Sequence, residues 1–141
     1  MRTILALVLI LSLASFAFAN YFAGVGGVGD VVGIVGGLTL TYNLADFGEG
    51  HTVLMGALGN GLGISANYTP FKIYEYNLGT KLAKVYLGAG AGLSFDLSGT
   101  SFVLGAGITF KTLIGDKFLL TSTSGYGIGG YYWSGAIAYI F

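Results

Sequence analysis

The chain has no cysteine and few charged residues, and both absences restrict what it can be. Without cysteine it can form no disulfide and has no site for a lipoprotein anchor. Charged residues amount to 9% of the sequence, whereas an average soluble domain has roughly 25%. A soluble domain this poor in charge would have difficulty staying dispersed. The chain is therefore expected either to be surrounded by lipid or to assemble.

Long apolar runs are also missing after the first segment. Beyond residue 19 no continuous apolar stretch reaches the roughly 18 residues of a transmembrane helix, so helical spans are not expected. The first segment differs, because Met1-Arg2 precedes an apolar run, Ile4 to Leu13, that is followed by Ala17-Phe18-Ala19. This order is typical of a secretory signal peptide, cleaved here before Asn20. The alternative is an uncleaved anchor, but the run is shorter than the about 20 residues that a span needs.

Residues 1–19 are therefore interpreted as a signal peptide and residues 20–141 as one domain. Once Arg2 has been removed, that domain carries five lysines against six acidic residues. A balance this close to neutral provides no basic surface for nucleic acid. No nucleic-acid partner is expected.

Composition favours strands over helices in the mature region. The chain contains 26 glycines, 10 tyrosines and 10 phenylalanines but a single proline. Charged residues fall in segments rich in turn-forming residues, namely at Asp30, 46–50, 72–84, 96–100 and 111–117. The runs between them predict about eight strands, each near the roughly 9–11 residues of a tilted membrane strand. Pro70 cannot donate a ladder hydrogen bond and is expected to end the fourth strand.

The runs alternate with period two, which indicates strands whose two faces meet different surroundings. Over 85–95, apolar residues at odd positions oppose Tyr86, Ser94 and three glycines at even positions, and 38–44, 62–69 and 102–111 follow the same rule. A water-facing polar side would be expected to carry lysine and glutamate, but this one carries almost none. The polar side therefore encloses a lumen and the apolar side meets lipid, where an open sheet edge would cost several kcal/mol per unpaired group. The sequence predicts an all-β fold, a closed antiparallel transmembrane β-barrel of about eight strands.

Aromatic residues recur at a spacing that suits a membrane. Phe102 and Phe110 are eight residues apart on one face, as are Trp133 and Phe141. At about 3.3 Å per residue this separation is roughly 26 Å along a strand. A tilt near 40° reduces it to about 20 Å of depth, comparable with the apolar band between two aromatic girdles. The alternative is that these aromatics cap a soluble core, since strands generally favour aromatic residues.

The chain ends with a strand-like segment, residues 131–141, in which alternate positions are apolar. These positions are Trp133, Gly135, Ile137, Tyr139 and Phe141. The segment resembles the terminal signature of bacterial outer-membrane barrels, although Gly135 departs from it because that position is usually larger. Residues 86–92 likewise look like the aromatic-aliphatic-Gly-Ala-Gly strands of the OmpW-like and OmpA-like barrels.

This resemblance implies an assembly signal made of Trp133, Ile137, Tyr139 and Phe141. In that family the barrel-assembly machinery reads the terminal strand, which pairs with the first strand to close the sheet. The expected partners are therefore that machinery during biogenesis and the lipids of the outer membrane. The short loops of this chain differ from those of family members that bind partners through long extracellular loops.

Patterns that suggest chemistry are weak, and no catalytic, cofactor-binding or metal-binding residue is predicted. Residues 24–29 match a dinucleotide-binding glycine pattern, but no preceding strand or following helix is expected there. His51 is the only histidine; a lone histidine cannot form a catalytic triad, and it is expected to be a solvated turn residue. No cluster of metal ligands accompanies it. The chain is not expected to be an enzyme or to need a cofactor.

Two functions remain open from the sequence. The first is a non-enzymatic outer-membrane barrel, acting as a structural element or as a narrow pore, because a lumen face of glycine, serine and threonine leaves room for water. The alternative is a secreted glycine-rich sheet protein that self-assembles at the cell surface through its strand edges. A soluble lipid-binding barrel is disfavoured by the uncharged polar face.

Overall fold

A computed structural model describes residues 1–17, 20–44, 48–98 and 101–141. Its elements are the helix α1 (Arg2–Ala17) and the strands β1 (Asn20–Val28), β2 (Val31–Leu44), β3 (Gly48–Gly59), β4 (Gly61–Asn77), β5 (Leu82–Asp96), β6 (Phe102–Ile114), β7 (Phe118–Ile128) and β8 (Gly130–Ile140). Three sequence predictions involve residues outside the described ranges, namely the cleavage site at Phe18-Ala19, the turn at Asp46 and the turn at Thr100.

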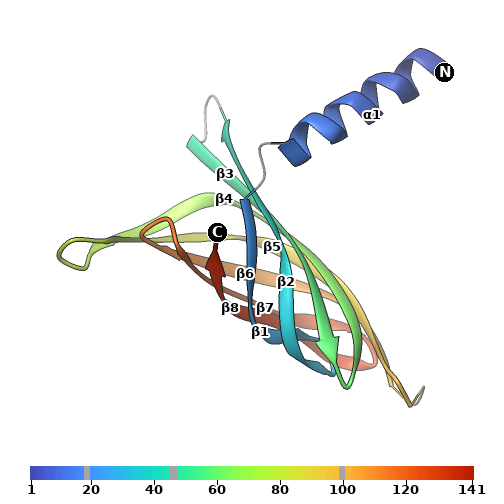
Figure 1. Ribbon diagram of the computed structural model, residues 1–141. Helices are drawn as coiled ribbons and strands as arrows, with labels where there is room; N and C mark the ends of the chain where they lie inside the picture. The colour runs from blue at the N-terminus through green and yellow to red at the C-terminus, as the bar shows by residue number, and fades with distance from the viewer. Residues whose placement is uncertain (18–19, 45–47, 99–100) are drawn as a thin grey trace.

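The strands form one closed antiparallel barrel in which each strand pairs with its neighbours in the chain (Figure 1). Seven residue pairs between β1 and β8, from Phe22↔Ile140 to Val28↔Ser134, close the sheet. The all-β class, the closed antiparallel barrel, the strand number and the pairing of first and last strands are therefore confirmed, and the transmembrane location stays a prediction. The start of β1, the end of β8 and the β4–β5 and β6–β7 turns share one end of the barrel, called here the terminal end; the β1–β2, β3–β4 and β7–β8 turns lie at the far end.

The two faces of the wall differ as the alternation predicts. On β4 the residues Gly63, Ser65, Asn67 and Thr69 are buried, whereas Leu62, Ile64, Ala66 and Tyr68 are exposed. On β5, Tyr86 and Ser94 are buried, and Ala89, Ala91 and Phe95 are exposed. Apolar side chains thus cover the outside of the barrel, and polar or small residues line much of its inside.

Large side chains inside the barrel fit over glycines of other strands. A Cβ on Gly105 of β6 would lie 2.4 Å from the Cβ of Tyr132 on β8, and one on Gly92 of β5 would lie 2.2 Å from the Tyr132 hydroxyl. Tyr132 therefore crosses the lumen. At the far end of the barrel, a Cβ on Gly63 of β4 would lie 2.8 Å from the Cβ of Val28 on β1. Glycines in the wall supply the space that the opposing side chains fill.

The prediction that Pro70 ends the fourth strand is wrong. The β4 strand continues to Asn77, and its register with β5 shifts between Tyr68 and Phe71 and again between Lys72 and Tyr74. A β-bulge leaves one residue outside the ladder, so a proline without an N–H group is tolerated there. Proline also suits this position because the pairs between β3 and β4 end at His51↔Thr69.

The helix α1 covers most of the segment interpreted as a signal peptide. Its side chains from Met1 to Leu9 are exposed. Among the described residues, no helix is both long and apolar enough to cross a membrane. Cleavage before Asn20 stays a prediction.

Candidate functional site

His51 lies inside the barrel, so the prediction of a solvated turn residue is wrong. It belongs to β3, and its side chain is 2% exposed. Its ring packs against Tyr86 of β5 with 4.1 Å between ring centroids. The inward position of His51 could not be predicted from the sequence, because the other inward residues of β3 include the apolar Val53 and Met55. The strand therefore lacks the polar–apolar alternation that would have placed His51 in the lumen.

Lys111 lies beside His51, although its sequence position suggested a turn. It belongs to β6 and its side chain is fully buried. The Lys111 Nζ atom donates a hydrogen bond to Thr39 Oγ1 at 3.0 Å and lies 3.1 Å from His51 Nδ1. A lysine side chain donates hydrogen bonds, so in this contact Nδ1 serves as the acceptor. A signal was present, because residue 111 continues the inward series 103, 105, 107 and 109.

This polar cluster joins the neighbouring strands β2 and β3, which carry Thr39 and His51, to the distant strand β6, which carries Lys111. Thr41 of β2 adds a further contact, with Oγ1 3.3 Å from His51 Nδ1. A buried ammonium group is costly unless it is hydrogen-bonded. Thr39 and His51 therefore supply the hydrogen-bond acceptors for Lys111, and these contacts link β2 and β3 to β6 across the lumen.

A pocket of about 420 Å³ opens above the cluster at the terminal end. Its lining is Thr41, His51, Thr80, Lys81, Leu82, Lys84, Tyr86, Leu113, Gly115 and Asp116. The β4–β5 and β6–β7 turns form its rim, and the Gly115 amide donates to the Leu82 carbonyl at 2.9 Å. Within the described parts of the chain, no group of three or more His, Asp or Glu side chains could hold a metal ion.

A second polar layer crosses the middle of the barrel. The Asn67 amide of β4 donates to Thr121 Oγ1 of β7 at 3.3 Å, and the hydroxyls of Thr109 and Thr123 are 2.6 Å apart. These four side chains are buried. Together with Tyr132 toward the far end and Lys111 toward the terminal end, they bridge the lumen at three levels. These buried side chains occupy part of the glycine-, serine- and threonine-lined lumen.

The predicted assembly residues lie on the outward face of β8. Ile137, Tyr139 and Phe141 are exposed, and Trp133 is partly exposed. Tyr139 packs edge-on against Phe118 of β7, with 5.8 Å between ring centroids, and against Phe141 at 5.7 Å. The structure therefore brings these aromatics together at the terminal end. Their role as an assembly signal stays a prediction.

Gly135, which departs from the family pattern, makes room for Trp133. A Cβ at Gly135 would lie 2.7 Å from Trp133 Cζ2 and 2.7 Å from the Thr121 carbonyl oxygen. The indole thus lies flat along the outer wall over Gly135, and its Nε1 atom donates to Ser122 Oγ at 3.3 Å. A larger residue at position 135 would displace the ring.

The outer wall carries an aromatic girdle at each end of the barrel. The terminal girdle is formed by Tyr21, Tyr68, Phe110, Phe118, Tyr139 and Phe141, and the far girdle by Phe95, Phe102, Tyr126 and Tyr131, all exposed. Phe102 and Phe110 fall in opposite girdles, as their spacing predicts. Between the girdles, no outward-facing side chain that the structure describes is charged.

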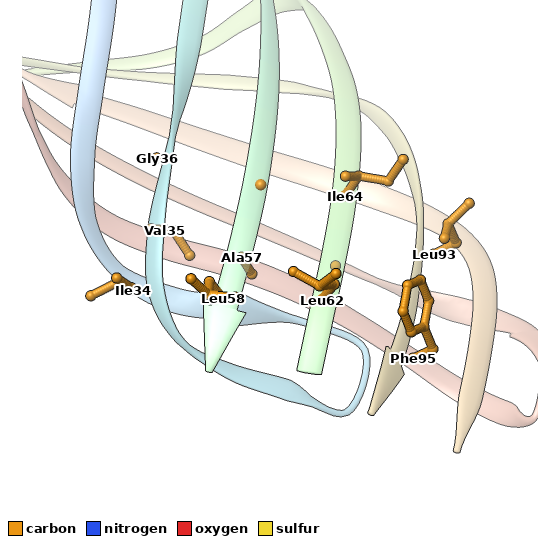
Figure 2. Close-up of a pocket in the computed structure, with 11 residues that line it drawn as sticks. Ile34, Val35, Gly36, Ala57, Leu58, Leu62, Ile64, Leu93 and Phe95 are labelled. Carbon is orange, nitrogen blue, oxygen red and sulfur yellow. The ribbon is translucent and has the colours of Figure 1, made fainter. Parts of the chain in front are cut away.

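A hollow of about 570 Å³ lies in the outer wall between these girdles, over β2 to β5. Figure 2 shows Ile34, Leu58, Leu62, Leu93 and Phe95 around it. Gly36 and Gly56 face each other across the β2–β3 pair within it. A Cβ at Gly56 would meet no atom closer than 3.9 Å, so neighbouring atoms do not require glycine there. The hollow is apolar and offers no group for catalysis.

Comparison of the chain with family models, with curated proteins and with solved structures gives no significant match.

Proposed function

We propose that this chain is a small barrel of the bacterial outer membrane that acts as a structural element. The observation that carries the proposal is the uncharged outer wall between two aromatic girdles. An apolar band flanked by aromatic girdles is the surface that a membrane barrel presents to lipid. In water the same wall would expose far more contiguous apolar area than a soluble monomer normally does. The signal peptide predicted over residues 1–19 supports export.

A structural role is favoured over a narrow pore by the contents of the lumen. Lys111 reaches across to Thr39, and Asn67 reaches across to Thr121. Tyr132 fills the space over Gly105. Eight-stranded barrels are only just wide enough to hold their own side chains, and these contacts extend across the lumen. No catalytic role is proposed for His51, because its Nδ1 atom accepts from Lys111 and it lies in an interior cluster.

The resemblance of residues 86–92 and 131–141 to OmpW-like and OmpA-like barrels belongs to this proposal. It supports the outer-membrane location, the barrel-assembly machinery as a biogenesis partner and a role of Trp133, Ile137, Tyr139 and Phe141 in assembly. The alternative of a self-assembling secreted sheet would require open edges. Pairing of β1 with β8 does not favour it.

The test is fractionation of cells that produce the full chain, followed by single-channel recording on the purified protein. We expect the protein in the outer-membrane fraction, with a faster gel mobility before boiling than after, and no steady conductance in a planar bilayer. A soluble periplasmic protein would overturn the membrane location. Steady conductance would leave the location intact and replace the structural role by the pore.

A further inference from the structure

The exposed residues at the terminal end of β4 continue the lipid-facing wall beyond the girdle. Every residue from Phe71 to Leu82 is exposed, and this hairpin extends past the rest of the barrel at the left of Figure 1. Its large apolar side chains are Phe71, Ile73, Tyr74, Tyr76, Leu78 and Leu82, with exposed fractions from 37% to 59%. A cluster of exposed apolar side chains of this kind normally marks a site that contacts another protein or a membrane.

The register places three of these aromatics on the outward face. Phe71 pairs with Leu87, which belongs to the lipid-facing face of β5. After the second register shift, Tyr74 pairs with Val85 and Tyr76 with Ala83, which lie two and four residues from Leu87 and so share its face. Directly paired residues point to the same side of a sheet. The two bulges thus re-aim β4 so that Tyr68, Phe71, Tyr74 and Tyr76 form one outward column.

Charged residues of the hairpin lie on its other face. Lys72 pairs with the lumen residue Tyr86, and Glu75 pairs with Lys84. Lys72 and Glu75 form an ion pair at 2.9 Å, and the Lys72 hydrogen bond holds the pKa of the Glu75 carboxyl below its usual value. The hairpin is therefore amphipathic, with its aromatic column on the same side as the membrane wall.

Its edge is poorly suited to pairing with a second strand. Beyond Thr69, β4 has no β3 partner among the described residues. Pro70, Lys72 and two bulges lie along this free edge, and proline, lysine and bulges are the devices by which native proteins block edge-to-edge pairing. A second copy of the chain adding a strand here is therefore disfavoured.

We propose that the aromatic column Phe71–Tyr74–Tyr76 anchors the barrel in the phospholipid headgroup layer at its terminal end. The column is continuous with the terminal girdle through Tyr68, and tyrosine suits a boundary where one side is apolar and the other is wet. Lys81 adds a cation at the same level, since its Nζ atom lies 5.3 Å from the centroid of the girdle residue Phe118. The Tyr74 and Tyr76 hydroxyls and the Lys81 ammonium group face lipid phosphates. This inference rests on the proposed membrane location.

The chain has a single tryptophan, Trp133, which is replaced first so that only the introduced tryptophan fluoresces. In full-length W133F protein, a reporter is introduced as Tyr76→Trp in the column, Glu75→Trp on the opposite face or Ile108→Trp in the mid-wall. Each protein is reconstituted in phosphatidylcholine vesicles containing lipids brominated either near the headgroup or in mid-chain. We expect Tyr76→Trp to be quenched most by bromine near the headgroup, Ile108→Trp by mid-chain bromine, and Glu75→Trp chiefly by aqueous acrylamide.

Each other outcome has a distinct meaning. If Tyr76→Trp is quenched by acrylamide as strongly as Glu75→Trp while Ile108→Trp is quenched by bromine, the barrel is in the membrane and the anchor is overturned. If Tyr76→Trp is protected from acrylamide but insensitive to bromine, a protein partner or second copy covers the column and the anchor is again overturned. If Ile108→Trp is also insensitive to bromine, and Trp133 in the unsubstituted protein is insensitive as well, the proposed membrane location itself fails.

Discussion

Glycines serve different purposes on the two faces of the barrel. Inside, Gly105 and Gly92 leave the space that Tyr132 fills, and a Cβ at Gly105 would overlap that ring. Outside, Gly56 has open space where its Cβ would be. The same residue type is therefore a packing requirement on one face and replaceable on the other.

We expect Gly105→Ala to lower the free energy of unfolding by about 1–3 kcal/mol, because overpacking forces neighbouring side chains out of their preferred positions. Gly56→Ala is the matched control, and it should leave stability unchanged or slightly raised, since glycine disfavours a strand interior. Urea titration of the barrel folded in lipid vesicles measures both. Equal stability of the two variants would contradict the tight contact between Gly105 and Tyr132.

Replacing His51 in the interior cluster should lower the free energy of unfolding more than replacing Lys111. His51→Leu leaves the buried Lys111 ammonium without its Nδ1 acceptor, and we expect a loss of about 3–5 kcal/mol. Lys111→Met removes the charge itself, and we expect about 1–3 kcal/mol. In the double variant the losses should fall short of additivity by about 0.5–3 kcal/mol. Strictly additive losses in the same urea titrations would show that the two side chains do not interact. The control is Thr112→Val, on the outward face beside Lys111.

At the scale of elements, β5 has two faces that meet different surroundings. Its outward residues Leu87, Ala89, Ala91 and Leu93 pair across the wall with outward residues of β4 and β6. Its inward residues are mostly glycines that face the packed lumen. A charge on the outward face should therefore be far more costly in lipid than a charge beyond the girdle.

For Ala89→Arg we expect a loss of about 2–4 kcal/mol if the residue lies near the membrane midplane, because arginine there cannot reach water easily. Thr80→Arg, in the exposed β4–β5 turn, is the control and should cost about 0–1 kcal/mol. Folding yield and urea stability in vesicles measure the difference. An Ala89→Arg barrel as stable as the control would argue that this wall is not in contact with lipid.

At the scale of the whole molecule, closure depends on the last residues of the chain. Ile140 is a buried core residue that pairs with Phe22, and Tyr139 pairs with Ala23. The Phe141 amide also donates to the Tyr21 carbonyl at 2.9 Å. These contacts hold the terminal end of the β1–β8 seam, the place where the sheet becomes a barrel.

A chain truncated after Ala138 should therefore fail to appear as a folded membrane species, and it should accumulate in the periplasm or be degraded. In hydrocarbon the start of β1, from Tyr21 to Ala23, would lose its β8 partners and leave backbone groups unpaired at several kcal/mol each. Tyr139→Ala, which removes a girdle aromatic, should impair assembly more than Ala138→Ser, which adds one hydroxyl inside. Protease protection and gel mobility without boiling are the measurements. Normal abundance of truncated, protease-resistant protein in the outer membrane would show that the pairs from Gly24↔Ala138 to Val28↔Ser134 are enough to close the barrel and that residues 139–141 are not required.

The sequence by itself determined the class of fold, the approximate number of strands and the direction of most side chains. Alternation with period two is a local property, so residues 62–69 and 85–95 carried it in their own order. Scarcity of charge likewise required no knowledge of distant contacts. The alternation and the scarcity of charge can both be read from one sequence, because the wall of a small barrel separates two different environments along its whole length.

Tertiary structure alone decided which residues meet across the lumen. His51 and Lys111 are 60 positions apart, and their contact follows from strand tilt and closure, which no local pattern records. Pro70 was misleading for the same reason, because a bulge at a free edge accommodates it. Local sequence fixes which side of the sheet a residue faces, whereas only the closed barrel fixes which neighbour it meets there.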